Sequence, residues 1–171
     1  MKKPFALVLA VTAVTLAAGT DLPIDGKFRR IANGLPENWL ISQPSAAKII
    51  GGGEFFSKVL QLTAADTGVT ATTRRSFPVS VTDKVEVEAE IKGRGTAFLA
   101  VELLDATGKS IGIQRIVTAT ATPHFRDIKG SLRLRDYTYS ASAPVKIRII
   151  CGVEPGSEIV FDGVDAELDR D

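Results

Sequence analysis

The feature that most constrains the fold of this chain is an alternation of apolar and polar residues with a period of two. It is clearest in residues 84–93, KVEVEAEIKG. The apolar positions of this segment are Val85, Val87, Ala89 and Ile91, and the polar positions are Glu86, Glu88, Glu90 and Lys92. Successive side chains of a strand point to opposite faces, so the alternation predicts a strand with one buried and one solvated face. We interpret the acidic row as that solvated face and not as a metal site.

Further segments of the chain also have the character of short strands. No stretch after residue 20 keeps a helical apolar repeat over three turns. About nine to eleven short strand-like segments follow one another instead, separated by Gly and Pro. They include residues 59–64, 68–81, 96–104, 110–122, 130–137, 145–153 and 158–168. This regular spacing without intervening helices predicts an all-β fold, an antiparallel β-sandwich of the jelly-roll type.

Residues 1–19, MKKPFALVLAVTAVTLAAG, have the pattern of a secretory signal peptide. Two lysines come first, an apolar run follows, and small residues end the segment. We expect cleavage before Thr20. The alternative is an uncleaved membrane anchor, although the apolar run is shorter than the ~20 residues that a spanning helix needs. Residues 20–171 are then a single β-sandwich domain of a secreted or periplasmic protein, with no membrane span after cleavage.

The charge balance argues against a nucleic-acid partner. The whole chain has a formal charge of +1, and loss of the two lysines of residues 1–19 changes it to −1. A nearly neutral mature chain gives no electrostatic reason to bind nucleic acid.

The usual catalytic patterns are missing from the sequence. Cys151, the only cysteine, alternates with Ile147 and Ile149, so we interpret it as a small buried hydrophobe and not as a catalytic thiol. His124 is the only histidine and follows a proline, which is typical of a surface loop. One His and one Cys cannot provide a zinc-binding pattern. We predict a protein that is not an enzyme; a small glycosidase or lyase is the least favoured reading.

Two groups of residues are candidates for ligand binding. Glu102 is flanked by apolar residues and Gln114 falls on the following strand, so the two could form a polar patch on a concave face. The second candidate is an exposed patch rich in aromatic and basic side chains. Its members are Tyr137, Tyr139, Arg133 and Arg135.

The order of three longer segments carries a resemblance to a known class of domain. They are DLPIDGKF followed by GLPENW, then VEVEAEIKGRGTAFLAVELLDATGKSIG, then VKIRIICGVEPGSEIVFDGVDAEL. Over about residues 22–168 the chain resembles galactose-binding-like jelly-roll domains, and among these the non-catalytic carbohydrate-binding modules of secreted bacterial glycosidases. The resemblance implies a module that binds carbohydrate and in which Trp39 packs inside the fold. The alternative is a structural or adhesive protein of the cell envelope or matrix, with an envelope component or another protein as its partner.

The resemblance also implies a role for Asp162. In such modules a calcium ion is often held where the first and last strands meet, by an opening Glu and a closing Asp. Asp162 matches the closing Asp, but Arg29 stands at the position of the opening Glu, and a guanidinium cannot ligate calcium. Our hypothesis is that Arg29 pairs with Asp162 and fastens the first strand to the last. A structural calcium ion on Asp162, or backbone amides as its only partners, are the two alternatives.

Overall fold

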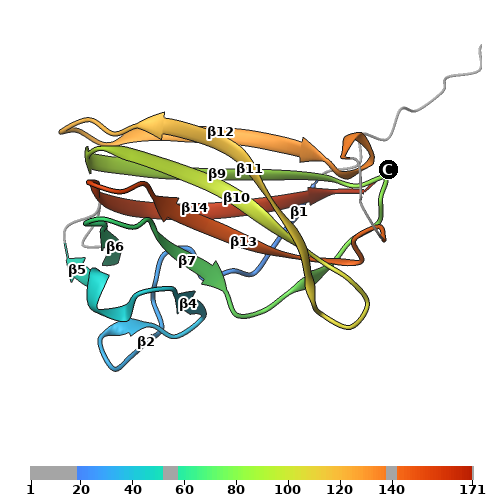
Figure 1. Cartoon of the computed structure of the whole chain (residues 1–171), viewed down its shortest axis with the longest axis horizontal. Coiled ribbons are helices and arrows are strands. Elements are labelled where there is room, and N and C mark those ends of the chain that lie inside the picture. The colour runs from blue at the N-terminus through green and yellow to red at the C-terminus, as the bar shows by residue number, and fades with distance from the viewer. Residues whose placement is uncertain (1–18, 52–57, 138–141, 171) are drawn as a thin grey trace, which may run out of the picture.

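The structure is a sandwich of two antiparallel β-sheets (Figure 1). It is a computed structural model that describes residues 19–51, 58–137 and 142–170. The described part also contains the short 3-10 turns η1 (Pro44–Ala46) and η3 (Leu134–Asp136). The predicted all-β jelly roll is confirmed. No helix among these residues is long and apolar enough to cross a membrane.

Each sheet contains six strands. The first, here the β9 sheet, has the order β12-β9-β14-β6-β5, with β1 beside β14. Its strands are β1 (Thr20–Asp21), β5 (Ala47–Gly51), β6 (Lys58–Thr63), β9 (Lys84–Arg94), β12 (Arg126–Arg133) and β14 (Glu158–Asp169). The second, here the β10 sheet, has the order β11-β10-β13-β7-β4, with β8 beside β13. Its strands are β4 (Trp39–Ile41), β7 (Val69–Thr73), β8 (Phe77–Pro78), β10 (Thr96–Leu104), β11 (Ser110–Thr120) and β13 (Lys146–Val153). A separate hairpin joins β2 (Ile31–Ala32) to β3 (Leu35–Pro36).

The chain changes sheet between several pairs of successive strands, which builds the sandwich. β9 ends at Arg94 and β10 begins at Thr96, yet the two strands lie in different sheets. Gly95, between them, has a φ of +100°, and a Cβ there would lie 2.3 Å from the Ser157 hydroxyl. This crossing therefore requires glycine. The steps from β6 to β7, from β11 to β12 and from β13 to β14 also change sheet.

The core lies between the sheets and follows the alternation of the sequence. The four apolar residues predicted to face inward on β9 are at most 3% exposed. They pack in one cluster with inward residues of β10, β13 and β14, including Leu99, Ile149 and Phe161. Trp39 is 1% exposed, which confirms that it packs inside the fold.

The first and last strands meet, as the sequence predicted, but through main-chain contacts. β1 pairs with the end of β14, and the Leu22 amide donates to the Ala166 carbonyl at 2.8 Å. The Val164 amide donates to the Gly26 carbonyl at 3.2 Å, next to a bulge where β14 shifts register. A Cβ on Gly26 would lie 1.5 Å from the Val164 carbonyl oxygen, so the two backbones touch there.

The hypothesis that Arg29 pairs with Asp162 is wrong. Arg29 is exposed. Among the described residues, no ion pair between Arg29 and Asp162 is present. The cause is local, because the Asp25 carboxylate accepts hydrogen bonds from the backbone amides of Arg29 and Arg30 at 3.1 and 3.2 Å. This folds the segment back on itself, and Arg29 lines a hollow with Arg74 and Arg75 instead.

Asp162 is 6% exposed and lies opposite Glu90 of β9 in the sheet register. A group of three or more His, Cys, Asp or Glu side chains arranged to hold a metal is not found among the described residues. Calcium binding by Asp162 therefore stays a prediction, and the described residues provide no group of ligands for it.

Candidate functional site

The outer face of the β10 sheet carries an unusual buried apolar patch. Along β10, Leu99 and Val101 face the main core, so Phe98, Ala100 and Glu102 face outward. Phe98 and Ala100 form a second small cluster with Ile150 of β13, and these three residues are 6%, 0% and 3% exposed. An outward face of a sheet is ordinarily polar and solvated. The Arg115 side chain covers one part of this patch, the Phe98 ring.

Glu102 and Arg148 form the polar centre of this face. They are direct partners in the register of β10 and β13, and the Arg148 Nε atom lies 2.9 Å from Glu102 Oε2. The two side chains are only 13% and 23% exposed. Arg148 Nε is nevertheless without a hydrogen-bond partner among the described residues, because the contact meets the distance of an ion pair but not the geometry of a hydrogen bond. The Nε atom itself is shielded from solvent, so a ligand can contact this pair only through the exposed parts of the two side chains.

A stacked aromatic ring lies next to this pair. The Arg115 guanidinium sits 4.1 Å from the centroid of the Phe98 ring and forms an ion pair with Glu154. On its other side the ring lies against Gly152, where a Cβ would be 2.4 Å from the ring Cζ. With a guanidinium over it and a glycine against its end, the ring is only 6% exposed. Phe98 supports the face and does not offer an open stacking surface.

Together these groups form a row across three strands. Ile113 of β11, Glu102 of β10 and Arg148 of β13 are aligned by the register. Ile113 is 59% exposed, the largest exposure among the exposed large apolar residues. The row therefore presents an apolar surface, an acceptor and a donor in sequence. Sugar rings have hydroxyl groups that both donate and accept, beside apolar C–H faces, and such a row can contact all of these.

The structure separates the predicted partners Glu102 and Gln114. Gln114 lies opposite Val101, a residue of the core face, and its amide donates to the Arg115 carbonyl at 3.3 Å. The residue opposite Glu102 on β11 is Ile113. A register shift on β11 sets this placement, and it is not visible in the sequence.

The second predicted patch lies around the end of β12. Arg133 is the last residue of β12 and is exposed. Arg135 belongs to η3 and has an ion-pair contact of 3.8 Å with Asp136. Tyr137 follows η3 and packs against the main core, with its hydroxyl 3.2 Å from the position of a Cβ on Gly112. Tyr139 lies outside the described residues. The proposed grouping of these residues as a ligand patch stays a prediction.

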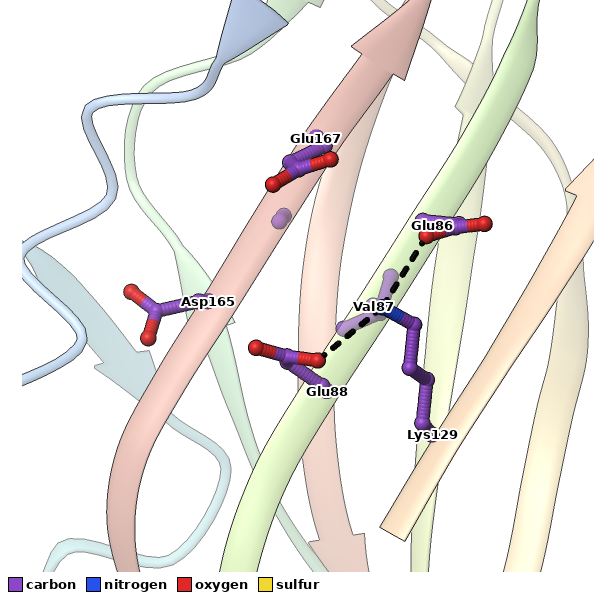
Figure 2. Close-up of a pocket in the computed structure, with 7 residues that line it drawn as sticks. Glu86, Val87, Glu88, Lys129, Asp165 and Glu167 are labelled. Carbon is purple, nitrogen blue, oxygen red and sulfur yellow. Dashed lines mark ion pairs between the residues drawn. The ribbon is translucent and has the colours of Figure 1, made fainter. Parts of the chain in front are cut away.

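The outer face of the β9 sheet carries a group of carboxylates that two lysines compensate in part. Figure 2 shows Lys129 reaching from β12 to Glu86 and Glu88 of β9, and its Nζ lies 3.1 Å from a carboxylate oxygen of each. Lys84 adds a contact of 2.6 Å to Glu86, and these hydrogen bonds lower the pKa of Glu86. Asp165 rises from β14 beside them, and partial burial raises its pKa. Glu167 lines the same surface, so four carboxylates stand against Lys84 and Lys129, and the face is solvated and acidic, in line with the interpretation of the acidic row.

The residues that most often provide catalysis are poorly placed for it. His124 is exposed. Cys151 is fully buried, and desolvation raises the pKa of its thiol to about 12. The thiolate, which is the reactive form of cysteine, is therefore strongly disfavoured in the folded protein.

This placement gives a test of the core around Cys151. We expect the folded protein to resist alkylation by iodoacetamide at pH 8 and to react fully once unfolded in guanidinium, because only unfolding returns the thiol to water. Mass spectrometry of the two samples measures the modification. Rapid alkylation of the native protein would contradict the buried position of Cys151.

Comparison with known proteins gives a likeness at the level of the fold. The sequence matches no family model and no curated protein. A xylan-binding domain, CBM22-1 of Xyn10C from Paenibacillus barcinonensis, is similar in structure, with a TM-score of 0.57 and 14% identity over 84% of this chain and 92% of that one. The chain shares the jelly-roll fold of carbohydrate-binding modules.

The same fold also occurs in enzymes. An arabinose-bound α-L-arabinofuranosidase, MgGH51, has a TM-score of 0.64 at 14% identity, over 87% of this chain and 26% of the enzyme. The present chain thus spans about a quarter of that enzyme. A cyclase from Fischerella sp. TAU has a TM-score of 0.65 at 9% identity, over 89% of this chain and 98% of that one. The fold is common to proteins of different activities, so function must be argued from the site.

Proposed function

We propose that this protein is a secreted, non-catalytic module that binds carbohydrate through the outer face of its β10 sheet. The observation that carries the proposal is the largely buried Glu102–Arg148 pair, in which 13% and 23% of the two side chains stay exposed beside the apolar Ile113. The fold shared with xylan-binding modules supports a sugar as the ligand. The signal-peptide pattern of residues 1–19 supports export to the place where such polysaccharides occur.

The geometry favours binding over catalysis. Glu102 is engaged in an ion pair with Arg148 at 2.9 Å, so its carboxylate is already held by a partner within the protein. The residue facing it on β11 is Ile113, so the register provides no second carboxylate opposite. Glycoside hydrolysis ordinarily needs two carboxyl groups facing one another across the bond. We infer that Glu102 accepts hydrogen bonds from ligand hydroxyls while Arg148 donates to them.

A variant that removes the pair together tests this role. We expect Glu102→Leu with Arg148→Leu to weaken binding of a neutral oligosaccharide on the order of 100-fold, because two charged hydrogen-bonding groups are lost. Replacing both partners with apolar residues leaves no stranded charge, so the fold should be kept. Isothermal titration calorimetry with xylo-oligosaccharides and other soluble neutral glycans measures the affinity.

The matched control removes an exposed ion pair from the other sheet. Lys129 and Glu88 are 3.1 Å apart and about half exposed, so Glu88→Leu with Lys129→Leu should change affinity less than about twofold. Equal losses in both variants would contradict the proposed site. Absence of binding to every neutral glycan, with capture of an envelope protein through Ile113, would favour the structural or adhesive alternative.

A further inference from the structure

Two arginine doublets that are far apart in the sequence line one hollow. Arg29 and Arg30 follow Phe28, and Arg74 and Arg75 connect β7 to β8. All four line a hollow of about 560 Å³ beside the N-terminal segment, here called the arginine hollow. Its size falls within the range of small-molecule sites in proteins. The residues of the outer face of the β10 sheet discussed above, Glu102 and Arg148, do not line it.

The loop that carries the first doublet is held rigidly. The Asp25 carboxylate accepts hydrogen bonds from the amides of Arg29 and Arg30 and, at 3.2 Å, from the side-chain amide of Asn38. Phe28 is fully buried, with its ring centroid 5.7 Å from that of Trp39. Asp25 and Phe28 have φ values of +54° and +48°, which are unfavourable for residues other than glycine. Such strain persists only where the surroundings impose it, and here the loop places Arg29 and Arg30 along one hollow.

The second doublet is also fixed in position. The Thr73 hydroxyl donates to the Arg75 carbonyl at 3.0 Å and accepts from the Ile149 amide at 3.1 Å, which ties this turn to β13. Arg74 Nε donates to the Glu37 carbonyl at 2.7 Å. The Arg75 guanidinium lies 5.6 Å from the centroid of the Phe77 ring. The backbone that carries both doublets is therefore ordered before a ligand binds, and one guanidinium, that of Arg74, is also held by a hydrogen bond, which lowers the ordering cost of binding.

The hollow is strongly positive. Asp25 is the only carboxylate that lines it, so four arginines and one aspartate give a formal charge of +3. The oxygens of Asp25 already accept the amides of the loop. Within the described ranges, none of the four guanidinium groups forms an ion pair with an acidic side chain. Residues 20–171 together have a formal charge of −1, so the positive charge of the hollow is a local concentration and not a property of the whole chain.

We propose that the arginine hollow binds an acidic oligosaccharide through its carboxylate or sulfate groups. Guanidinium groups hold both kinds of oxyanion with paired, parallel hydrogen bonds. Arg74 also lines a neighbouring hollow of about 460 Å³ with a largely apolar wall that includes Leu35, Pro36 and Leu40. An oligosaccharide can place its charged groups on the arginines and its ring faces on this wall.

A nucleic acid fits the same surface less well. Single-stranded nucleic acids bind through bases stacked on exposed aromatic rings. The aromatic residue lining the arginine hollow is Phe77, which is only 3% exposed, and Trp39 in the neighbouring hollow is 1% exposed. Neither ring offers a free face for a base. The observations therefore favour an acidic glycan.

Calorimetry on the mature protein tests the proposal with four probes: oligogalacturonate, a sulfated galactan oligosaccharide without carboxylates, a neutral xylo-oligosaccharide and polyuridylate. We expect at least one acidic glycan to bind, more weakly as salt is raised. Arg29→Gln with Arg75→Gln should weaken that binding on the order of 100-fold, because two charged donors are removed. The first two probes distinguish carboxylate from sulfate as the recognised group.

The control pair is Arg94→Gln with Arg126→Gln, two exposed arginines outside the arginine hollow that carry the same total charge. It should alter the affinity less than about twofold. Equal weakening by both pairs, no binding of either acidic glycan, or tighter binding of polyuridylate than of any glycan would overturn the proposal. The double variant Glu102→Leu with Arg148→Leu should keep its affinity for the acidic glycan, so failure of the neutral-sugar site and failure of the arginine hollow are separable.

Discussion

Replacement of Trp39 by alanine is expected to lower the free energy of unfolding by about 3–5 kcal/mol. The indole is 1% exposed and packs against the Phe28 ring, so its removal opens a large cavity. It also removes the hydrogen bond from the indole Nε1 to the Asp25 carbonyl at 3.3 Å, which leaves that part of the N-terminal loop less well held. The loss should therefore appear both as lower stability and as weaker binding at the arginine hollow.

The neighbouring residue provides the control. Leu40 follows Trp39 on β4 but is 37% exposed, so Leu40→Ala should cost less than about 1 kcal/mol. Urea unfolding followed by circular dichroism measures both variants, because Trp39 is the only tryptophan and its fluorescence is lost with it. Similar midpoints for the two variants would mean that Trp39 does not anchor the core.

Local pattern was enough to predict the fold class and the core face of its strands. The period-two repeat of residues 84–93 predicted which side chains of β9 are buried, because strand geometry alone decides it. The same reasoning predicted that Cys151 is buried, whereas the burial of Trp39 was implied by the family resemblance. These features depend on residues close together in the sequence, and pattern analysis needs no more than that.

Cross-strand partners could not be predicted in the same way. Glu102 was identified from its apolar neighbours, but its partner Arg148 lies on β13, three strands later in the chain, and was missed. Gln114 was paired with Glu102 by proximity in the sequence, whereas a register shift on β11 places Ile113 there. A shift of one residue moves a side chain to the other face of a sheet, so partner prediction requires the register itself.

The N-terminal segment shows how a resemblance can misplace a side chain. Comparison of motifs placed Arg29 opposite Asp162, at the position of a calcium ligand. The local hydrogen bonds of Asp25 decide otherwise, since they capture the amides of Arg29 and Arg30 and fold the loop toward β7 and β8. The signal that could have identified the hollow is the pair of Arg-Arg doublets at 29–30 and 74–75. Their convergence depends on tertiary structure.

The two proposed sites differ in the physics of recognition, which makes them experimentally distinct. Glu102 and Arg148 are largely buried and mutually compensated, so ligand binding there should depend little on salt. The arginine hollow has an uncompensated positive charge, so its binding should be salt-sensitive. A protein that used both would recognise a polysaccharide with neutral and acidic segments. The cyclases and glycosidases of the same fold show that the β-sandwich itself decides neither property.

The second large effect is expected where the first segment meets the last strand. We expect Gly26→Ala to lower the free energy of unfolding by about 2–4 kcal/mol. A Cβ at this position would lie 1.5 Å from the Val164 carbonyl oxygen and 2.5 Å from its carbon, and backbone atoms cannot move aside as a flexible side chain does. The segment must then detach from β14, with loss of the bond from the Val164 amide to the Gly26 carbonyl.

Gly51→Ala is the matched control, because a Cβ on Gly51 meets no atom of the described residues within 4 Å. Its effect should stay within about 0.5 kcal/mol of the parent. Hydrogen exchange measured by mass spectrometry adds a local readout to thermal unfolding. In Gly26→Ala the amides of Leu22 and Val164 should exchange faster than in the control, because both depend on this contact. Equal unfolding temperatures of the two variants, together with equal exchange rates of these amides, would contradict the prediction. The main-chain contact between residues 20–26 and β14 would then contribute little to stability.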